Sequence, residues 1–102
     1  MPEISVIRIQ VTADCTTLHI PDSFSSALHW QFRDICDNAC AQKRYVVDFS
    51  ETTYIDSAAM GMLLLLRKQA GGDSANLVII NCSPELITIF RTSSFDKLFQ
   101  FR

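Results

Sequence analysis

The sequence predicts an α/β fold in which one domain carries a mixed β-sheet of four to five strands and about three helices. Strand-like and helix-like runs alternate along most of the chain, which is the pattern of βαβ units. A length of 102 residues suits a single domain, and the 48% of hydrophobic residues are enough to fill one core. No internal repeat or linker interrupts the sequence, so residues 1–102 are assigned to one domain.

The chain opens with a predicted β-hairpin. Residues 4–11 alternate with a period of two, and a turn at 12–14 connects them to a second short strand at 16–20. One face of the first strand is expected on the core because it is apolar after its first residue, and it carries Ser5, Ile7, Ile9 and Val11.

A helix is predicted after the hairpin. Pro21 breaks the second strand, and Asp22 or Ser23 is placed to cap the helix. Trp30 lies off the apolar stripe of this helix, where it either contacts a partner or packs under a neighbouring loop. The stripe predicts an amphipathic helix of about four to five turns and consists of Phe24, Leu28, Phe32, Ile35, Cys36 and Ala39.

The rest of the chain alternates strand and helix patterns. In order these are a strand at 45–49, a polar loop at 50–57, a helix at 58–70, a strand at 77–80, a helix that starts at Ser83-Pro84, and a last edge strand within 95–101. The overall order is β-β-α-β-α-β-α-β. Its later connections are βαβ crossovers, which pair their strands in parallel, whereas the first hairpin makes the sheet mixed.

Charge and hydropathy exclude several classes of protein. The formal net charge is −2 and the charges are scattered, so no basic stripe is present to bind nucleic acid. No run approaches the roughly 20 apolar residues of a membrane span. Pro2 and Glu3 follow Met1, where a secretory signal would have a basic and then an apolar segment. We therefore expect a cytoplasmic domain that does not insert into a membrane.

The four cysteines predict free thiols and no metal site. Cys36 and Cys40 are the only close pair, at helical i,i+4 spacing, and the sequence has no CxxC motif. The two histidines, His19 and His29, are not spaced as partner ligands. Buried or half-buried thiols in a reducing compartment are the expected state, and no cofactor is expected.

The segment with most functional interest runs from Tyr54 to Gly61, where a loop enters a helix. Ser57 stands beside the helix N-terminus, a region of unpaired backbone N–H groups and positive dipole. Its hydroxyl either caps the helix or accepts a phosphate, which a helix N-terminus tolerates. Nucleophilic catalysis is disfavoured because the G-x-S-x-G context and a nearby base are missing, so no enzyme activity is expected.

These segments resemble the signature of STAS domains of the anti-sigma factor antagonist family. The resemblance rests on Val46–Ser50 followed by Asp56–Gly61, where the family has a strand, a loop and an Asp-Ser that opens a helix. Ile20–Asp22, Ser83–Glu85 and Phe95–Phe99 support it, and it covers nearly the whole chain. The element order predicted above agrees with that of the family.

The resemblance implies a regulatory binding module. Its partner would be an anti-sigma factor that is also a serine kinase of the histidine-kinase-like ATPase type, and this kinase would phosphorylate Ser57. A serine phosphatase is a further expected partner. Asp22, an aspartate that opens the first helix in the family, is either a neighbour of the phosphorylation site or a plain helix cap. The implied contact residues are Asp22, Asp56, Ser57, Ala58, Ala59, Met60 and Gly61.

Two positions depart from the family pattern. Ala58-Ala59 stands where the family has a small hydroxyl residue and then glycine. Alanine favours a helix over glycine by about 1 kcal/mol, but its methyl group would weaken recognition if a partner approaches closely there. Ser94 stands in a turn where glycine is more usual.

A second function is left open by the sequence. STAS domains also serve as accessory subunits of transport complexes, such as lipid-trafficking ABC transporters. Such a subunit would bind a permease or ATPase and need no modification of Ser57. The two functions predict different partners for the same domain.

Overall fold

A five-stranded sheet forms the centre of the protein in the computed structural model, which describes residues 6–40 and 43–102. The strand order is β1-β2-β4-β6-β7, and a separate two-stranded sheet pairs β3 with β5. The strands are β1 (Arg8–Val11), β2 (Cys15–His19), β3 (Ser23–Phe24), β4 (Arg44–Asp48), β5 (Tyr54–Ile55), β6 (Leu77–Ile80) and β7 (Gln100–Phe101). The helices are α1 (His29–Asp37), α2 (Ser57–Gln69) and α3 (Pro84–Thr92), with 3-10 helices η1 (Ser26–Leu28), η2 (Gly72–Ser74) and η3 (Phe95–Lys97).

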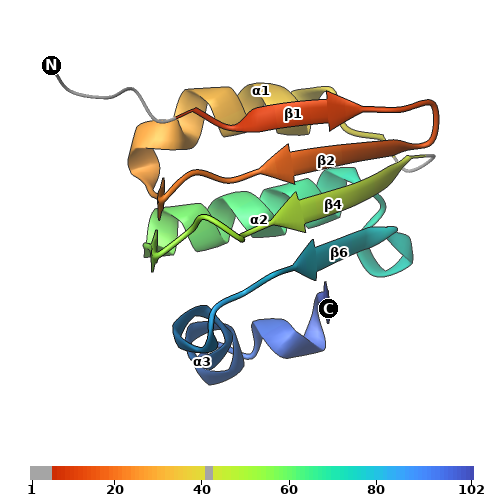
Figure 1. Ribbon diagram of the computed structural model, residues 1–102. Helices are drawn as coiled ribbons and strands as arrows, with labels where there is room; N and C mark the ends of the chain where they lie inside the picture. Colours follow the sequence, from red (N-terminus) through yellow and green to blue (C-terminus); the bar gives the residue numbers. More distant parts are fainter. Residues whose placement is uncertain (1–5, 41–42) are drawn as a thin grey trace, which may run out of the picture.

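The main sheet is mixed, as predicted. β1 pairs antiparallel with β2 in the hairpin, whereas β2 with β4, β4 with β6, and β6 with β7 pair in parallel. Helices α1 and α2 lie behind the sheet in Figure 1, and α3 lies beside the β6 end. The predicted fold class is therefore confirmed. In the described ranges no helix is long and apolar enough to cross a membrane.

The core lies between the sheet and its helices. Alternate strand residues point to the helices, and the central ones, Leu18, Val47 and Ile79, have no exposed surface. Leu63 and Leu66 of α2 meet them from the other side and are also fully buried. This packing accounts for the apolar residues on one side of α2, whereas Leu64 on the other side is 41% exposed.

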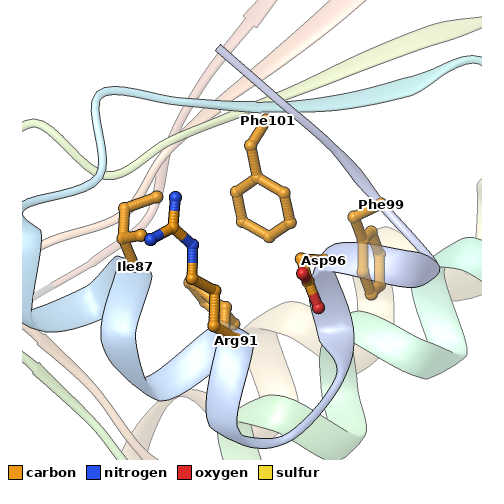
Figure 2. Close-up of a pocket in the computed structure, with 6 residues that line it drawn as sticks. Ile87, Arg91, Asp96, Phe99 and Phe101 are labelled. Atoms are coloured by element: carbon orange, nitrogen blue, oxygen red, sulfur yellow. The ribbon is translucent and has the colours of Figure 1, made fainter.

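Aromatic rings extend the core toward the C-terminus. Phe49 lies 5.8 Å from Phe24 and 5.9 Å from Phe90, measured between ring centroids. Phe90 also contacts Phe101, whose ring points toward a hollow of about 240 Å³ between α3 and η3 (Figure 2). The C-terminal strand is thus held by side-chain packing as well as by its backbone pairing with β6.

The first predicted helix is wrong at its start. Residues 24–28 form the end of β3 and then η1, and α1 begins only at His29. Asp22 therefore caps no helix, and the Ser25 hydroxyl caps η1 by accepting the Ala27 N–H at 3.3 Å. The physical reason is that Phe24 pairs with Ile55 in the small sheet, so its backbone is extended despite the helical spacing of its side chain.

Two more expectations need correction. The polar loop predicted at 50–57 contains strand β5, and α2 starts at Ser57. On the predicted core face of the first strand only Ile7 is buried, whereas Ile9 and Val11 are 45% and 63% exposed because β1 is the outermost strand. Ser5, the first residue of that face, lies outside the described residues.

Two side chains that the sequence left uncertain are placed by the structure. Trp30 is 82% exposed, so it does not pack under a loop. Ser94 adopts a left-handed conformation with φ of 63°, which explains why glycine is more usual at this turn.

Candidate functional site

Two loops far apart in the sequence run side by side at one end of the sheet. The Thr53 N–H donates to the Asp22 carbonyl at 2.8 Å, and β3 then pairs in parallel with β5. The buried Thr52 hydroxyl donates to the carbonyls of Ile20 and Pro21 at 3.1 and 2.9 Å. These bonds hold the segment after β2 against the segment that leads into α2.

Asp56 closes this pairing and starts the helix. Its Oδ1 accepts the Ala59 N–H at 2.8 Å, which makes it the N-cap of α2. Its Oδ2 accepts the Ser26 N–H at 3.2 Å, at the start of η1. One carboxylate therefore satisfies backbone donors of two helical segments, and it sets the direction in which α2 leaves the loop.

Ser57 is the first residue of α2 and is exposed. Asp56, not Ser57, is the cap, so the Ser57 hydroxyl makes no hydrogen bond within the described part of the chain and is accessible. The first turn of α2 contains no acidic residue. A phosphate on this hydroxyl would lie at the positive end of a 13-residue helix, where an anion is stabilised.

The neighbours of Ser57 divide between surface and core. Ala58 and Gly61 are exposed and Met60 is half-buried, whereas Ala59 is fully buried. The Ala59 methyl group therefore belongs to the core and does not face an approaching protein. A Cβ atom built on Gly61 would meet nothing within 4 Å, so the fold itself does not require glycine there.

Asp22 contacts the loop that leads into α2. It faces Thr53, whose hydroxyl donates to its carboxylate at 2.5 Å, and it precedes the β3–β5 pairing that ends at Asp56. The Ser26 N–H contacts Asp56, a contact that the sequence interpretation missed. Two consecutive serines after a strand were the available signal, because serine favours helix starts.

A groove adjoins this surface between α2 and α3. It has a volume of about 350 Å³ and is lined by Met60, Thr88, Ile89, Thr92 and Ser93. Ile89 is 38% exposed, although it belongs to the apolar side of α3. The exposed start of α2 therefore continues into a partly apolar hollow.

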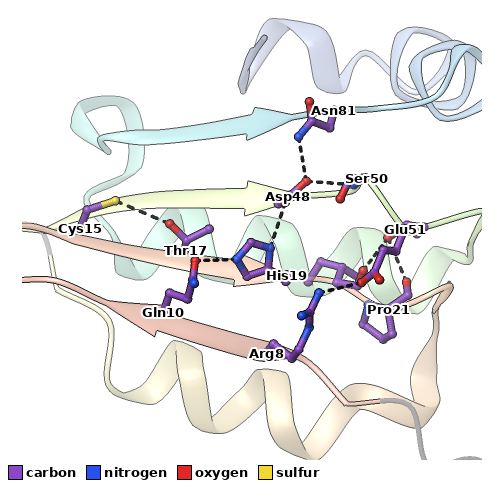
Figure 3. A network of polar contacts seen from close by, with 12 residues as sticks. Arg8, Gln10, Cys15, Thr17, His19, Pro21, Asp48, Ser50, Glu51 and Asn81 are labelled. Atoms are coloured by element: carbon purple, nitrogen blue, oxygen red, sulfur yellow. Dashed lines mark hydrogen bonds and ion pairs between the residues drawn. The ribbon is translucent and has the colours of Figure 1, made fainter.

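A second polar cluster lies at the carboxyl ends of β2 and β4 (Figure 3). The Asp48 carboxylate lies 2.9 Å from His19 Nδ1 and accepts hydrogen bonds from the Asn81 side chain and the Ser50 N–H. Burial by itself raises the pKa of Asp48, but the hydrogen bonds from Asn81, Ser50 and His19 outweigh it and lower the pKa below its normal value of 3.8. The cluster pins the start of the loop that carries the Asp56 cap.

The thiols of Cys36 and Cys82 are not activated as nucleophiles. Burial raises the pKa of Cys36 to about 12 and that of Cys82 to about 11, so both thiols stay protonated at neutral pH. The four cysteines are free. Within the described ranges, no three His, Cys, Asp or Glu side chains are grouped to hold a metal ion.

The geometry defines a small α/β domain with an exposed helix start. A family model described as "Mlab, STAS domain" matches residues 7–100, and the chain belongs to the STAS domain family. A STAS-domain containing protein of Pseudomonas aeruginosa (strain UCBPP-PA14) is 46% identical over 85 residues, which are 82% of this chain and 84% of that protein. Domains of this fold are typically non-catalytic.

Solved structures of anti-sigma factor antagonists have the same fold. An antagonist from Mycobacterium paratuberculosis superposes with a TM-score of 0.79 at 11% identity, covering 99% of this chain and 87% of that one. The antagonist SpoIIAA gives 0.74 in its unphosphorylated form, covering 95% and 87% of the two chains. Its phosphorylated form, from Bacillus, gives 0.73 with 95% and 91% covered, and both forms are 15% identical to this chain.

Replacing Asp56 by alanine should destabilise the fold by about 1–2 kcal/mol, because the Ala59 and Ser26 N–H groups lose their acceptor. Asp56→Asn keeps one oxygen acceptor and should lose less. Urea unfolding followed by circular dichroism measures both. The control is Asp22→Ala, which removes only an exposed contact with Thr53 and should change stability by less than about 0.5 kcal/mol. An Asp56→Ala protein as stable as the wild type would contradict this role.

Acid should weaken the fold through Asp48. Its pKa is lower in the folded than in the unfolded protein, so between these two values the unfolded chain binds more protons. The stabilisation is present above about pH 4 and is lost as the pH falls through the folded pKa. The free energy of unfolding should therefore decrease more steeply on acidification for the wild type than for Asp48→Asn. Equal slopes for the two proteins, measured by urea unfolding at several pH values, would refute it.

Proposed function

We propose that this protein is an anti-sigma factor antagonist that is switched by phosphorylation of Ser57. In this proposal it binds a kinase-type anti-sigma factor with a histidine-kinase-like ATPase fold, and it acts in the cytoplasm. The observation that carries the proposal is the accessible Ser57 hydroxyl at the first position of α2, beside a cap that leaves this hydroxyl free. ATP and the catalytic groups would belong to the partner, and a serine phosphatase would reset the site.

The electrostatics of the helix start favour a reversible switch. A phosphate adds about −1.5 to −2 charges at neutral pH, directly after the Asp56 carboxylate. The dipole of α2 and its free N–H groups compensate part of this charge, so the fold tolerates the modification. A partner surface that matches the unmodified site would instead face a strongly anionic patch. A loss of about 3–4 kcal/mol in binding corresponds to a few hundredfold in affinity.

The small residues on α2 favour close approach of a partner. Ser57, Ala58 and Gly61 are exposed on one side of the helix, since i+3 and i+4 neighbours share a face. Glycine inside a helix costs about 0.5–1 kcal/mol relative to alanine, and no atom of this protein occupies the space that a Gly61 side chain would fill. Close approach of another protein at this position would explain why the sequence has glycine there and not alanine. Met60 and the groove beside Ile89 would extend that contact.

The likeness to known antagonists supports the proposal at the level of the fold. SpoIIAA has been solved in unphosphorylated and phosphorylated forms. The present chain places a serine at the start of a helix in a fold of that kind. Of the contact residues expected from the sequence, Ala59 is fully buried, which argues against a direct contact of its methyl group with a partner. Asp22 is exposed and hydrogen-bonded to Thr53, and it stays among the proposed contact residues.

A second candidate is an accessory subunit of a transport complex of the lipid-trafficking ABC transporter type. The family description that matches this chain is the one that names Mlab, and this observation keeps the candidate open. Affinity purification of the tagged chain from its own cells distinguishes the two. A histidine-kinase-like partner supports the antagonist, whereas a permease or transport ATPase bound equally by wild type and Ser57→Ala supports the transport subunit.

Phosphate uptake should depend on Ser57 alone. Incubation with the partner kinase and ATP should add one phosphate to the wild type and none to Ser57→Ala, as measured by mass spectrometry. Ser26→Ala, which removes a neighbouring exposed serine, should be phosphorylated normally. Ser57→Asp should weaken binding to the partner at least tenfold in a calorimetric titration, because it places a negative charge on the contact surface. Full phosphorylation of Ser57→Ala would refute the assignment.

Gly61→Ala should increase the stability of the fold but decrease its affinity for the partner. The new methyl group meets no atom of the fold, so the free energy of unfolding should increase by up to about 1 kcal/mol. Affinity for the partner should fall about tenfold if the partner approaches the helix closely. Gln69→Ala, an exposed substitution in the last turn of the same helix, should leave affinity unchanged. Unaltered binding by Gly61→Ala would place the contact elsewhere.

A further inference from the structure

The outer edge of β1 is only partly covered. β1 has a single neighbour in the sheet, β2, and the Thr12 N–H donates toward that neighbour, to the Cys15 carbonyl at 2.8 Å. In an antiparallel pair, alternate residues direct both backbone groups to the same side. Arg8 and Gln10 therefore bond to β2, whereas Ile9 and Val11 direct their N–H and C=O groups outward.

One side chain already protects part of this edge. The Gln31 amide of α1 accepts the Ile7 N–H at 2.8 Å and donates to the Ile7 carbonyl at 2.8 Å, so it occupies both outward groups of that residue. Within the described residues no hydrogen bond reaches the outward groups of Ile9 and Val11. The uncovered edge is thus limited to two residues and four backbone groups, with no proline or bulge to block pairing.

The side chains along this edge are apolar where an edge strand is usually charged. Ile9 and Val11 are 45% and 63% exposed. They line a hollow of about 210 Å³ under β1 together with Ile35 and Tyr45 and with the polar residues Thr16, Asp34, Asn38 and Lys43. The one charged side chain of β1, Arg8, is held by Glu51 at 3.0 Å. The edge therefore offers both backbone groups and apolar surface to another strand.

We propose that a second copy of this chain pairs antiparallel along this edge, with the two-fold axis at Gln10. This register places Ile9 of each copy opposite Val11 of the other, as two hydrogen-bonded pairs. Each pair exchanges two N–H···O bonds, so all four outward groups of each copy are satisfied and Gln31 keeps its place on Ile7. The side chains oppose favourably as well, because Ile9 meets Val11 and the neutral Gln10 meets its own copy.

This surface is independent of the proposed switch. It shares no residue with Ser57, Gly61 or the groove beside Ile89, so each copy of the dimer would keep a free partner surface. The edge is short, and the pairing is therefore weak and concentration-dependent. A dimer of this kind would present two copies of the contact surface to its partner.

Charge substitution at Gln10 tests the register. Gln10→Lys or Gln10→Glu places two like charges directly opposite each other and should weaken dimerisation several-fold in analytical ultracentrifugation. An equimolar mixture of the two variants should recover the dimer, because Lys then faces Glu. Gln10→Ala is the matched control, since it also loses the contact with His19 but adds no charge. Its dimerisation should exceed that of either charged variant.

Hydrogen exchange of the unmodified protein gives a readout that needs no variant. The Ile9 and Val11 amides should become protected as concentration rises, whereas the Gln10 amide, already bonded to β2, should not change. A wild type that stays monomeric up to about 1 mM would overturn the proposal. So would a dimer that both charged variants keep, or a mixture that dimerises no better than each variant alone.

Discussion

The position of the candidate site depends on one carboxylate. Asp56 accepts backbone N–H groups from the start of α2 and from Ser26 at the start of η1, which is 30 positions away from it in the sequence. The two donors bind different oxygens, Oδ1 for Ala59 and Oδ2 for Ser26, whereas an asparagine would offer only one acceptor oxygen. The carboxylate thus joins the two loops where the small β3–β5 sheet ends. Because Asp56 caps α2, the hydroxyl of Ser57 is not needed as a helix cap.

This division of roles explains how the site can change charge without changing the fold. The core under α2 is formed by Ala59, Leu63 and Leu66, which lie on the buried side of the helix. Ser57 and Gly61 lie on the exposed side and contribute no packing. A modification there alters the surface potential while the apolar contacts that hold the helix to the sheet remain. The Asp48 cluster secures the other end of the same loop, so the helix start is fixed from both directions.

Local patterns were sufficient for most of the secondary structure. The strand at 77–80 and the helix that follows Ser83 were predicted at their observed positions, because β-branched runs and a serine cap before proline are signals contained within a few residues. The helix predicted from Phe24 failed for the opposite reason. Its apolar spacing is helical, yet the backbone of Phe24 bonds to a segment about 30 residues away. The spacing of apolar residues along the sequence contains no information about such a distant pairing partner.

The sequence by itself determined the fold class, the order of the main-sheet strands and α-helices, and Ser57 at a helix start, because periodicity and capping residues are local properties of the chain. Only the tertiary structure decided which groups surround that serine. It placed Asp22 beside Thr53, brought the Ser26 N–H to Asp56 and buried the Ala59 methyl group. It also left the edge of β1 open beyond Gln31. These outcomes depend on the packing of the loops and of α1 against the sheet, which couples residues distant in the sequence.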